Sequence, residues 1–146
     1  MTRNIEYCKS LFDRCYSPYS KFNVVTVLVC KDKIYSGVNV ENCSYSLTVC
    51  AETNCISNAV ADGLDFNDAQ YMIVMTNTAD EITPCGSCRQ FMAEFLPKHF
   101  KVHTIGNNAI VQTYEVKDLI LLFIVLAAYY FHTLYPHPTK WWIMLK

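Results

Sequence analysis

ITPCGSCRQFMAEF, residues 82–95, places two cysteines three positions apart at the start of an amphipathic run. Pro84 precedes the first cysteine, and a helix is expected from about Cys88 to Leu96, closed by Pro97. A Cys-x-x-Cys pair at such a place is compatible with a disulfide, a redox pair or half of a metal site. The choice among the three depends on what else in the chain can complete the site.

The composition indicates one compact domain. Of the 146 residues, 52% are apolar and 17% are charged, which allows a sizeable core. The net charge of −1, with no run of lysines or arginines, argues against nucleic acid as a partner. The first ten residues, MTRNIEYCKS, contain no apolar segment of the kind found in a secretory signal. Eight cysteines in such a chain indicate metal binding or catalysis in the cytoplasm rather than a disulfide scaffold.

Hydrophobic periodicity predicts a helix over residues 4–16 and another over 48–61, which stops at Asp62-Gly63. Runs rich in β-branched residues predict strands, the first two joined by a charged hairpin turn at 31–33. Strands alternate with helices after this hairpin. We therefore expect an α/β fold, a three-layer α/β/α sandwich with a mixed central sheet. The predicted strands are 21–30, 34–40, 71–77, 101–106 and 110–116.

A second helix start can complete a metal site. In TVCAETNC, residues 48–55, Cys50 and Glu52 fall in the first turn of a predicted helix, as Cys85 and Cys88 do in theirs. Catalytic zinc sites use three protein ligands and leave the fourth position to a water. The three cysteines would therefore bind one Zn²⁺ per chain. Glu52, two residues after a ligand, is placed to exchange protons with the metal-bound water.

The surroundings of the cysteines suit this hypothesis. Three thiolates leave a surplus negative charge on the zinc site, and two helix N-termini would each offset about half a charge. Arg89, which follows Cys88, could add a full positive charge. By their pattern alone, however, Thr53 and Arg89 are ordinary solvent-facing helix residues.

Four segments carry a resemblance: SPYSKF (17–22), GVNVENCSY (37–45), CAE (50–52) and PCGSCRQ (84–90). In this order and spacing, the chain resembles the small homotetrameric cytidine deaminases of the three-cysteine zinc type over about residues 5–120. The resemblance implies hydrolytic deamination of cytidine and deoxycytidine, as in pyrimidine salvage. Zinc-bound hydroxide would attack C4, and Glu52 would protonate N3 and then the leaving ammonia.

The resemblance also implies substrate-binding residues. Asn39 and Glu41 fall where the family holds the sugar hydroxyls, Phe22 falls where an aromatic ring packs against the base, and Ala51 is a further substrate-binding position. The Glu41 carboxylate can accept from a sugar hydroxyl and would repel a phosphate, which favours nucleosides over nucleotides. By residue type alone, Phe22 is a core residue and Asn39 a turn former.

The chain departs from the family in three places. Thr53 stands where the family has an arginine that donates to the zinc thiolates, although a threonine can still donate a weaker hydrogen bond. The strand at residues 24–28 has bulkier side chains than the small residues that the family has in this strand. Residues 119–131 are thirteen consecutive apolar residues, fewer than the roughly 20 that span a bilayer. We expect a deaminase domain over 1–124 and an atypical hydrophobic tail over 125–146, with a core or inter-subunit helix favoured over membrane association and over a poorly ordered tail.

Two other functions fit part of the pattern. A deaminase of another cytosine-bearing nucleoside, such as an aminonucleoside antibiotic, uses a similar cysteine set, but NVEN (39–42) favours a ribose. A zinc-stabilised binding protein without turnover is the other, and the intact Glu52 argues against it. An absorbance assay with cytidine, deoxycytidine, cytosine and deoxycytidine monophosphate distinguishes these functions.

Overall fold

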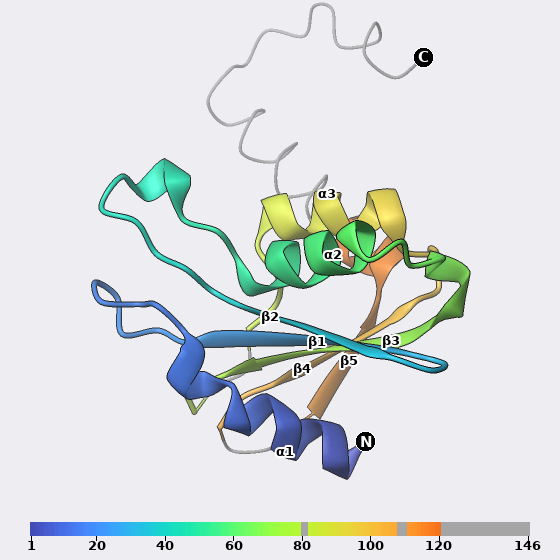
Figure 1. Ribbon diagram of the computed structural model, residues 1–146, viewed down its shortest axis with the longest axis horizontal. Helices are drawn as coiled ribbons and strands as arrows, with labels where there is room; N and C mark the ends of the chain where they lie inside the picture. Colours follow the sequence, from blue (N-terminus) through green and yellow to red (C-terminus); the bar gives the residue numbers. More distant parts are fainter. Residues whose placement is uncertain (80–81, 108–110, 121–146) are drawn as a thin grey trace, which may run out of the picture.

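The computed structural model describes residues 1–79, 82–107 and 111–120. In this part of the chain a five-stranded sheet lies between two helical layers, with α1 on one face and α2 and α3 on the other (Figure 1). The predicted three-layer α/β/α sandwich is confirmed. The helices are α1 (Thr2–Ser10), α2 (Ala51–Ala61) and α3 (Gly86–Phe95), and the strands are β1 (Val24–Cys30), β2 (Ile34–Val38), β3 (Ala69–Thr76), β4 (Lys101–Ile105) and β5 (Val111–Glu115).

The sheet is mixed, as predicted, with the strand order β2-β1-β3-β4-β5. Only β3 and β4 pair in parallel, and the other three pairs are antiparallel. Since parallel neighbours need a crossover connection, α3 lies between β3 and β4 in the chain. Every residue of β1 is buried, because the strand is covered on both faces.

Alternate strand residues form two separate cores. One lies beneath α2 and α3 and includes Leu28, Met72 and Met92, and the other lies beneath α1 and includes Val25 and Val27. Both valines are fully buried. The bulkier side chains of the strand at 24–28 are therefore accommodated in part beneath α1. Apolar burial of this kind is the main source of fold stability.

Several predicted boundaries were wrong by a few residues. The opening helix ends at Ser10, and residues 12–14 form a separate 3-10 turn. α2 begins at Ala51 rather than at Thr48, because Val49 pairs with Val40 in an isolated bridge and the backbone just before the helix is extended. The strands predicted over 21–30, 34–40, 71–77, 101–106 and 110–116 are observed as β1 to β5, and the helix predicted from Cys88 begins at Gly86.

The chain after β5 starts as a helix at residues 116–120. Val116 and Leu119 are buried in the core beneath α2 and α3, so this segment belongs to the folded domain. The predicted tail, 125–146, lies outside the described residues. Among the helices of the described ranges, none has the length and apolar character needed to cross a bilayer.

α2 lies directly against β2 at Gly37. A Cβ atom at this position would be 2.3 Å from the carbonyl oxygen of Ala51 and 2.5 Å from the amide nitrogen of Cys55. Both are backbone atoms of the first turns of α2, and such atoms cannot move aside cheaply. Only glycine therefore allows this approach, and it fixes the position of the helix start that carries Cys50 and Glu52.

We predict that Gly37→Ala lowers the free energy of unfolding by about 1–3 kcal/mol, the usual cost of overpacking, and also weakens zinc retention because α2 is pushed off the sheet. Chemical denaturation and metal analysis measure the two effects. Gly63→Ala is the matched control: Gly63 has a φ of 75° and open space around its Cβ, so this change should cost about 1–2 kcal/mol without loss of zinc. Equal zinc retention in both variants would contradict the proposed role of the close approach.

Candidate metal centre and active site

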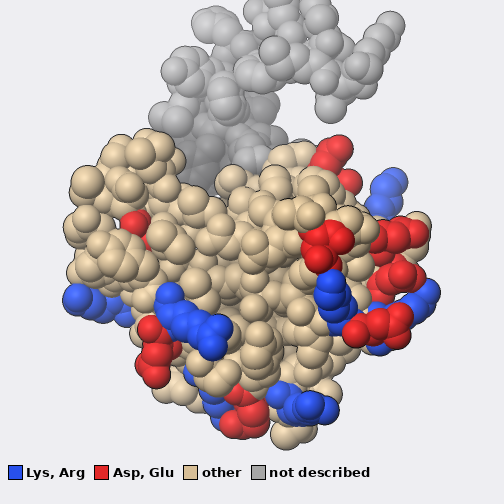
Figure 2. Space-filling view, viewed as in Figure 1, with Lys and Arg blue, Asp and Glu red and all other residues tan. Residues whose placement is uncertain are grey.

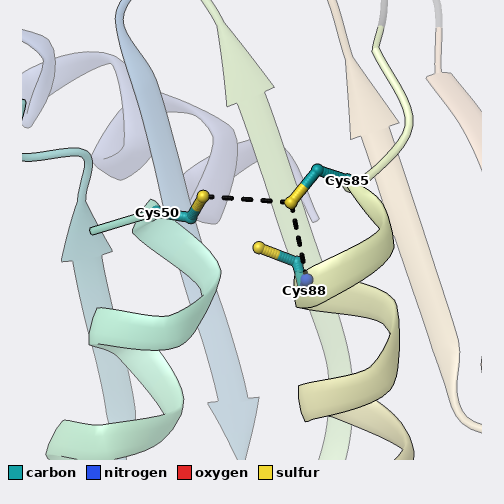
Figure 3. A group of neighbouring side chains, drawn as sticks. All are labelled: Cys50, Cys85 and Cys88. Atoms are coloured by element: carbon teal, nitrogen blue, oxygen red, sulfur yellow. Dashed lines mark hydrogen bonds between the residues drawn. The ribbon is translucent and has the colours of Figure 1, made fainter. Parts of the chain in front are cut away.

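Three cysteine sulfurs meet at the N-termini of two helices. Cys50 is the N-cap residue of α2, Cys85 is the N-cap residue of α3, and Cys88 lies in the first turn of α3. Their Sγ atoms all lie within 4.8 Å of one another, and those of Cys50 and Cys85 are 4.0 Å apart. Figure 3 shows the three side chains pointing toward a common centre between the two helix starts.

The geometry of this cluster suits zinc. With Zn–S bonds of about 2.3 Å, tetrahedral coordination separates sulfur ligands by roughly 3.8 Å. The observed sulfur separations need only small side-chain movements to reach that value. All three thiols are free, so the Cys-x-x-Cys pair is not a disulfide here. Within the described residues, this is the only group of His, Cys, Asp and Glu side chains that meets the geometry of a metal site.

The helix starts also favour negative charge on these sulfurs. The backbone N–H of Cys88 donates to Cys85 Sγ at 3.5 Å, and each helix N-terminus acts as roughly half a positive charge. Between the thiols, a hydrogen bond with Cys88 lowers the pKa of Cys50 to about 7. The same hydrogen bond, together with burial, raises the pKa of Cys88. The cluster is therefore ready to hold at least one thiolate at neutral pH.

Glu52 brings a buried carboxyl group to the cluster. It lies in the first turn of α2, its side chain is only 4% exposed, and burial raises its pKa. The backbone N–H of Glu52 and, to a smaller degree, the Cys88 side chain oppose this rise, so the carboxyl group lies near Cys88. A buried acid at this position can both accept and release a proton.

Thr53 is half-buried beside the cluster, and Arg89 is buried next to Cys88 in the chain. The hydroxyl of Thr53 lies 3.9 Å from Cys88 Sγ, in the position expected of a weak neutral donor. Arg89 is only 8% exposed, so its interpretation as a surface helix residue was wrong. Within the described residues no carboxylate forms an ion pair with its guanidinium.

The guanidinium of Arg89 donates hydrogen bonds to two backbone carbonyls and one side-chain hydroxyl. Nε donates to the carbonyl of Pro84 at 2.6 Å, and Nη2 donates to Thr83 Oγ1 at 2.7 Å. Nη1 donates to the carbonyl of Leu119 at 3.4 Å. Arg89 therefore fixes the loop that leads into Cys85 and ties it to the helix that follows β5. Neither Thr83 nor Leu119 was recognised from the sequence, because nothing in its local pattern links them.

The residues predicted to contact substrate lie at the end of the sheet where β1 begins and where β2 and β3 finish, the end that also carries the sulfur cluster. Strand pairing places Val24, at the start of β1, opposite Thr76, at the end of β3, while Val25 is opposite Val38, at the end of β2. Phe22 and Asn39 directly flank these strand ends. Ala51 is fully buried in the first turn of α2, at the same end of the sheet.

Asn39 and Glu41 already have protein partners. The side chain of Asn39 donates to the carbonyl of Phe22 at 2.8 Å and accepts from the amide of Val24 at 3.0 Å. The carboxylate of Glu41 accepts hydrogen bonds from Tyr19 and Ser20. These bonds lower the pKa of Glu41, the Ser20 hydroxyl most of all. Ser20 lies inside the SPYSKF motif, but the sequence pattern gave it no role.

Comparison with known proteins agrees with this geometry. Residues 2–104 match the family described as the cytidine and deoxycytidylate deaminase zinc-binding region. A cytidine deaminase from Mycoplasma genitalium is 30% identical over 80% of this chain and 89% of its own length. Another, from Halalkalibacterium halodurans, is 38% identical over 72% of this chain and 79% of its own.

Among solved structures, the crystal structure of a cytidine deaminase from Burkholderia pseudomallei superposes with a TM-score of 0.74 at 36% identity. The match covers 79% of this chain and 91% of that protein. The motifs, the fold and the sulfur cluster thus agree with one another. The chain belongs to the family of cytidine and deoxycytidylate deaminases defined by this zinc-binding region.

Proposed function

We propose that this protein is a zinc-dependent enzyme that hydrolyses cytidine and deoxycytidine to uridine and deoxyuridine, with release of ammonia. The observation that carries the proposal is a three-sulfur cluster at two helix N-termini, with a buried carboxyl group, Glu52, two residues after one of its cysteines. Relatives named cytidine deaminase, which match most of the chain, support it.

Cys50, Cys85 and Cys88 are the proposed zinc ligands, with one ion per chain. When bound at such a site, zinc acidifies a water molecule and so supplies a nucleophile near neutral pH. The Thr53 hydroxyl, 3.9 Å from Cys88 Sγ, would donate to this sulfur in its thiolate form, and Arg89 is a buried cation next to Cys88 in the chain. The two residues would thereby stabilise the thiolate form that binds metal.

Glu52 is the proposed proton shuttle. The reaction adds water at C4 of the base and expels the amino group, so a proton must move from the water to N3 and another to the leaving nitrogen. A carboxyl group whose pKa is raised by burial can accept each proton and pass it on. Its position in the first turn of α2 holds it beside the reacting atoms throughout.

Phe22, Asn39, Glu41 and Ala51 are the proposed substrate-binding residues. The ring of Phe22 is partly buried against the core and would pack against the base. Glu41 would accept a hydrogen bond from a sugar hydroxyl, and Asn39 supports this part of the site by holding the backbone at Phe22 and Val24. The negative charge of Glu41 disfavours a substrate phosphate, which supports a nucleoside as the substrate.

We also propose that the protein assembles with copies of itself, as a tetramer by its resemblance to the family. The loop between β2 and α2 projects from the body of the molecule (Figure 1), and Tyr45 and Leu47 in it are 90% and 63% exposed. Figure 2 shows few charged side chains over this region, whereas acidic and basic side chains are mixed over the opposite part of the same face. Exposed apolar surface of this kind is typical of an interface.

The deaminase domain would extend over 1–124, with 125–146 as an appendage, and the reaction would take place in the cytoplasm. The described core includes Leu119, which sets a lower limit for the end of the domain. Eight free thiols suit a reducing compartment.

The ligand assignment predicts that Cys85→Ala lowers the zinc content from about one ion per chain to a small fraction of that, because three-cysteine catalytic sites have no spare protein ligand. Metal analysis of the purified protein measures this content. Cys43→Ala is the matched control, since Cys43 is an exposed cysteine outside the cluster, and it should retain zinc. Full zinc content in Cys85→Ala, or deamination of cytidine by a zinc-free chain, would disprove the assignment.

The shuttle assignment predicts that Glu52→Gln keeps its fold and zinc but loses at least roughly 10³-fold in turnover, because an amide cannot carry the proton in either transfer. Steady-state deamination of cytidine, followed by absorbance, is measured beside zinc content. Glu94→Gln removes an exposed carboxylate of α3 and should have full activity. More than a tenth of wild-type activity in zinc-loaded Glu52→Gln would rule out the shuttle, and an inactive wild type would favour a zinc-stabilised binding protein.

The domain assignment predicts that a chain ending at Ile124 retains zinc, activity and the oligomeric state of the full chain, since it keeps the buried core through Leu119 and the exposed loop at Tyr45. Light scattering should give the same multiple of the chain mass for both proteins. A monomeric or zinc-free shortened chain would show that residues beyond 124 belong to the folded assembly.

A further inference from the structure

The turn at residues 17–21 lies against the carboxylate of Glu41. The backbone N–H groups of Tyr19 and Ser20 both donate to Oε2, at 3.0 and 3.2 Å. The hydroxyl of Ser20 donates to the other oxygen, Oε1. Two consecutive N–H groups that converge on one oxygen form a small anion-binding nest. The turn therefore binds the carboxylate through both of its oxygens.

This turn is held in shape independently of Glu41. Lys21 has a φ of 59°, a left-handed backbone that is unfavourable for a residue with a side chain. Its amide donates to the carbonyl of Ser17 at 3.1 Å. Asn77, which follows β3, donates to the carbonyl of Lys21 at 3.1 Å and accepts from the amide of Asn23 at 2.9 Å. These bonds keep the strained turn in place, so its donors are already oriented.

Ser20 connects the residues assigned to the sugar with the residue assigned to the base. Its hydroxyl oxygen accepts from the amide of Phe22 at 3.0 Å while its hydrogen is donated to Glu41. The carbonyl of Phe22 in turn accepts from Asn39. One continuous chain of hydrogen bonds thus runs from Glu41 through Ser20 and Phe22 to Asn39.

The number of donors on Glu41 limits how it can bind a substrate. An ionised carboxylate offers about four lone-pair sites, and the three donors of the turn occupy three of them. About one site therefore remains for a hydroxyl group, and its direction is set by the turn. If the Ser20 hydroxyl is lost, Oε1 gains a second free site and the carboxylate can rotate about the oxygen that the amides still hold.

We propose that Ser20 is a positioning residue for sugar recognition: its hydroxyl directs the free lone pair of Glu41 toward one sugar hydroxyl. This inference rests on the proposed deamination of nucleosides. It concerns the orientation of the carboxylate and not the chemical step. The effect of Ser20 should therefore depend on whether the substrate carries sugar hydroxyls.

The test compares cytidine with 2′,3′-dideoxycytidine, which lacks both hydroxyls of the sugar edge, in wild type, Ser20→Ala, Ser20→Thr and Ser17→Ala. We expect Ser20→Ala to raise KM for cytidine about tenfold, the size of one lost hydrogen bond to a charged group, with kcat changed less than about twofold. KM for dideoxycytidine should change less than about twofold. Ser20→Thr keeps the hydroxyl and should restore the KM of wild type.

Ser17→Ala is the matched control, because Ser17 lies in the same turn and bonds to Asn23 instead of Glu41. It should leave the discrimination between the two nucleosides unchanged. Three results would overturn the inference alone: no rise in KM for Ser20→Ala, an equal rise for both nucleosides, or the same loss of discrimination in Ser17→Ala. A zinc-loaded wild type that deaminates neither nucleoside would overturn the proposed function together with it.

Discussion

The structure depends on the convergence of two helix N-termini on one small volume that holds three sulfur atoms. Each helix start contributes about half a positive charge, which together offset the surplus negative charge of three thiolates around a divalent ion. Cys50 and Cys85 are themselves N-cap residues, so two of the proposed metal ligands also begin the helices. Metal binding and the packing of α2 against α3 are for this reason parts of the same interaction.

Arg89 links the loop before this centre to the helix after β5. A buried guanidinium without a carboxylate partner is costly unless its N–H groups are hydrogen-bonded. Neutral oxygens accept from it here, among them the carbonyl of Pro84, just before Cys85, and the hydroxyl of Thr83. The same side chain reaches the carbonyl of Leu119, so the helix after β5 is tied to the loop that presents a metal ligand.

The sequence predicted the layers of the fold, the sheet class and the membership of the cysteine cluster, because these follow from periodicity and from residue types with few alternative uses. It could not predict the burial of Arg89, whose partners are a carbonyl before Cys85 and another thirty residues away. It also gave no role to Ser20. Its hydroxyl reaches Glu41, which lies 21 residues further along the chain, and no local pattern links the two residues. The start of α2 was placed too early because Val49 is held in an extended bridge with Val40, on the other side of the projecting loop.

Alternate residues 37, 39 and 41 connect the two halves of the site. Gly37 allows α2 to approach the sheet, Asn39 fixes the start of β1, and Glu41 is held by the turn. In an extended strand, residues two apart point in the same direction at a spacing of about 6.6–6.8 Å. Because β2 ends at Val38, the position of Gly37 influences where Asn39 and Glu41 lie. A shift of one residue in the pairing of β2 with β1 would place Val38 or Ser36 beneath α2, where a Cβ has no room. The steric requirement at Gly37 therefore sets the register that also places Glu41.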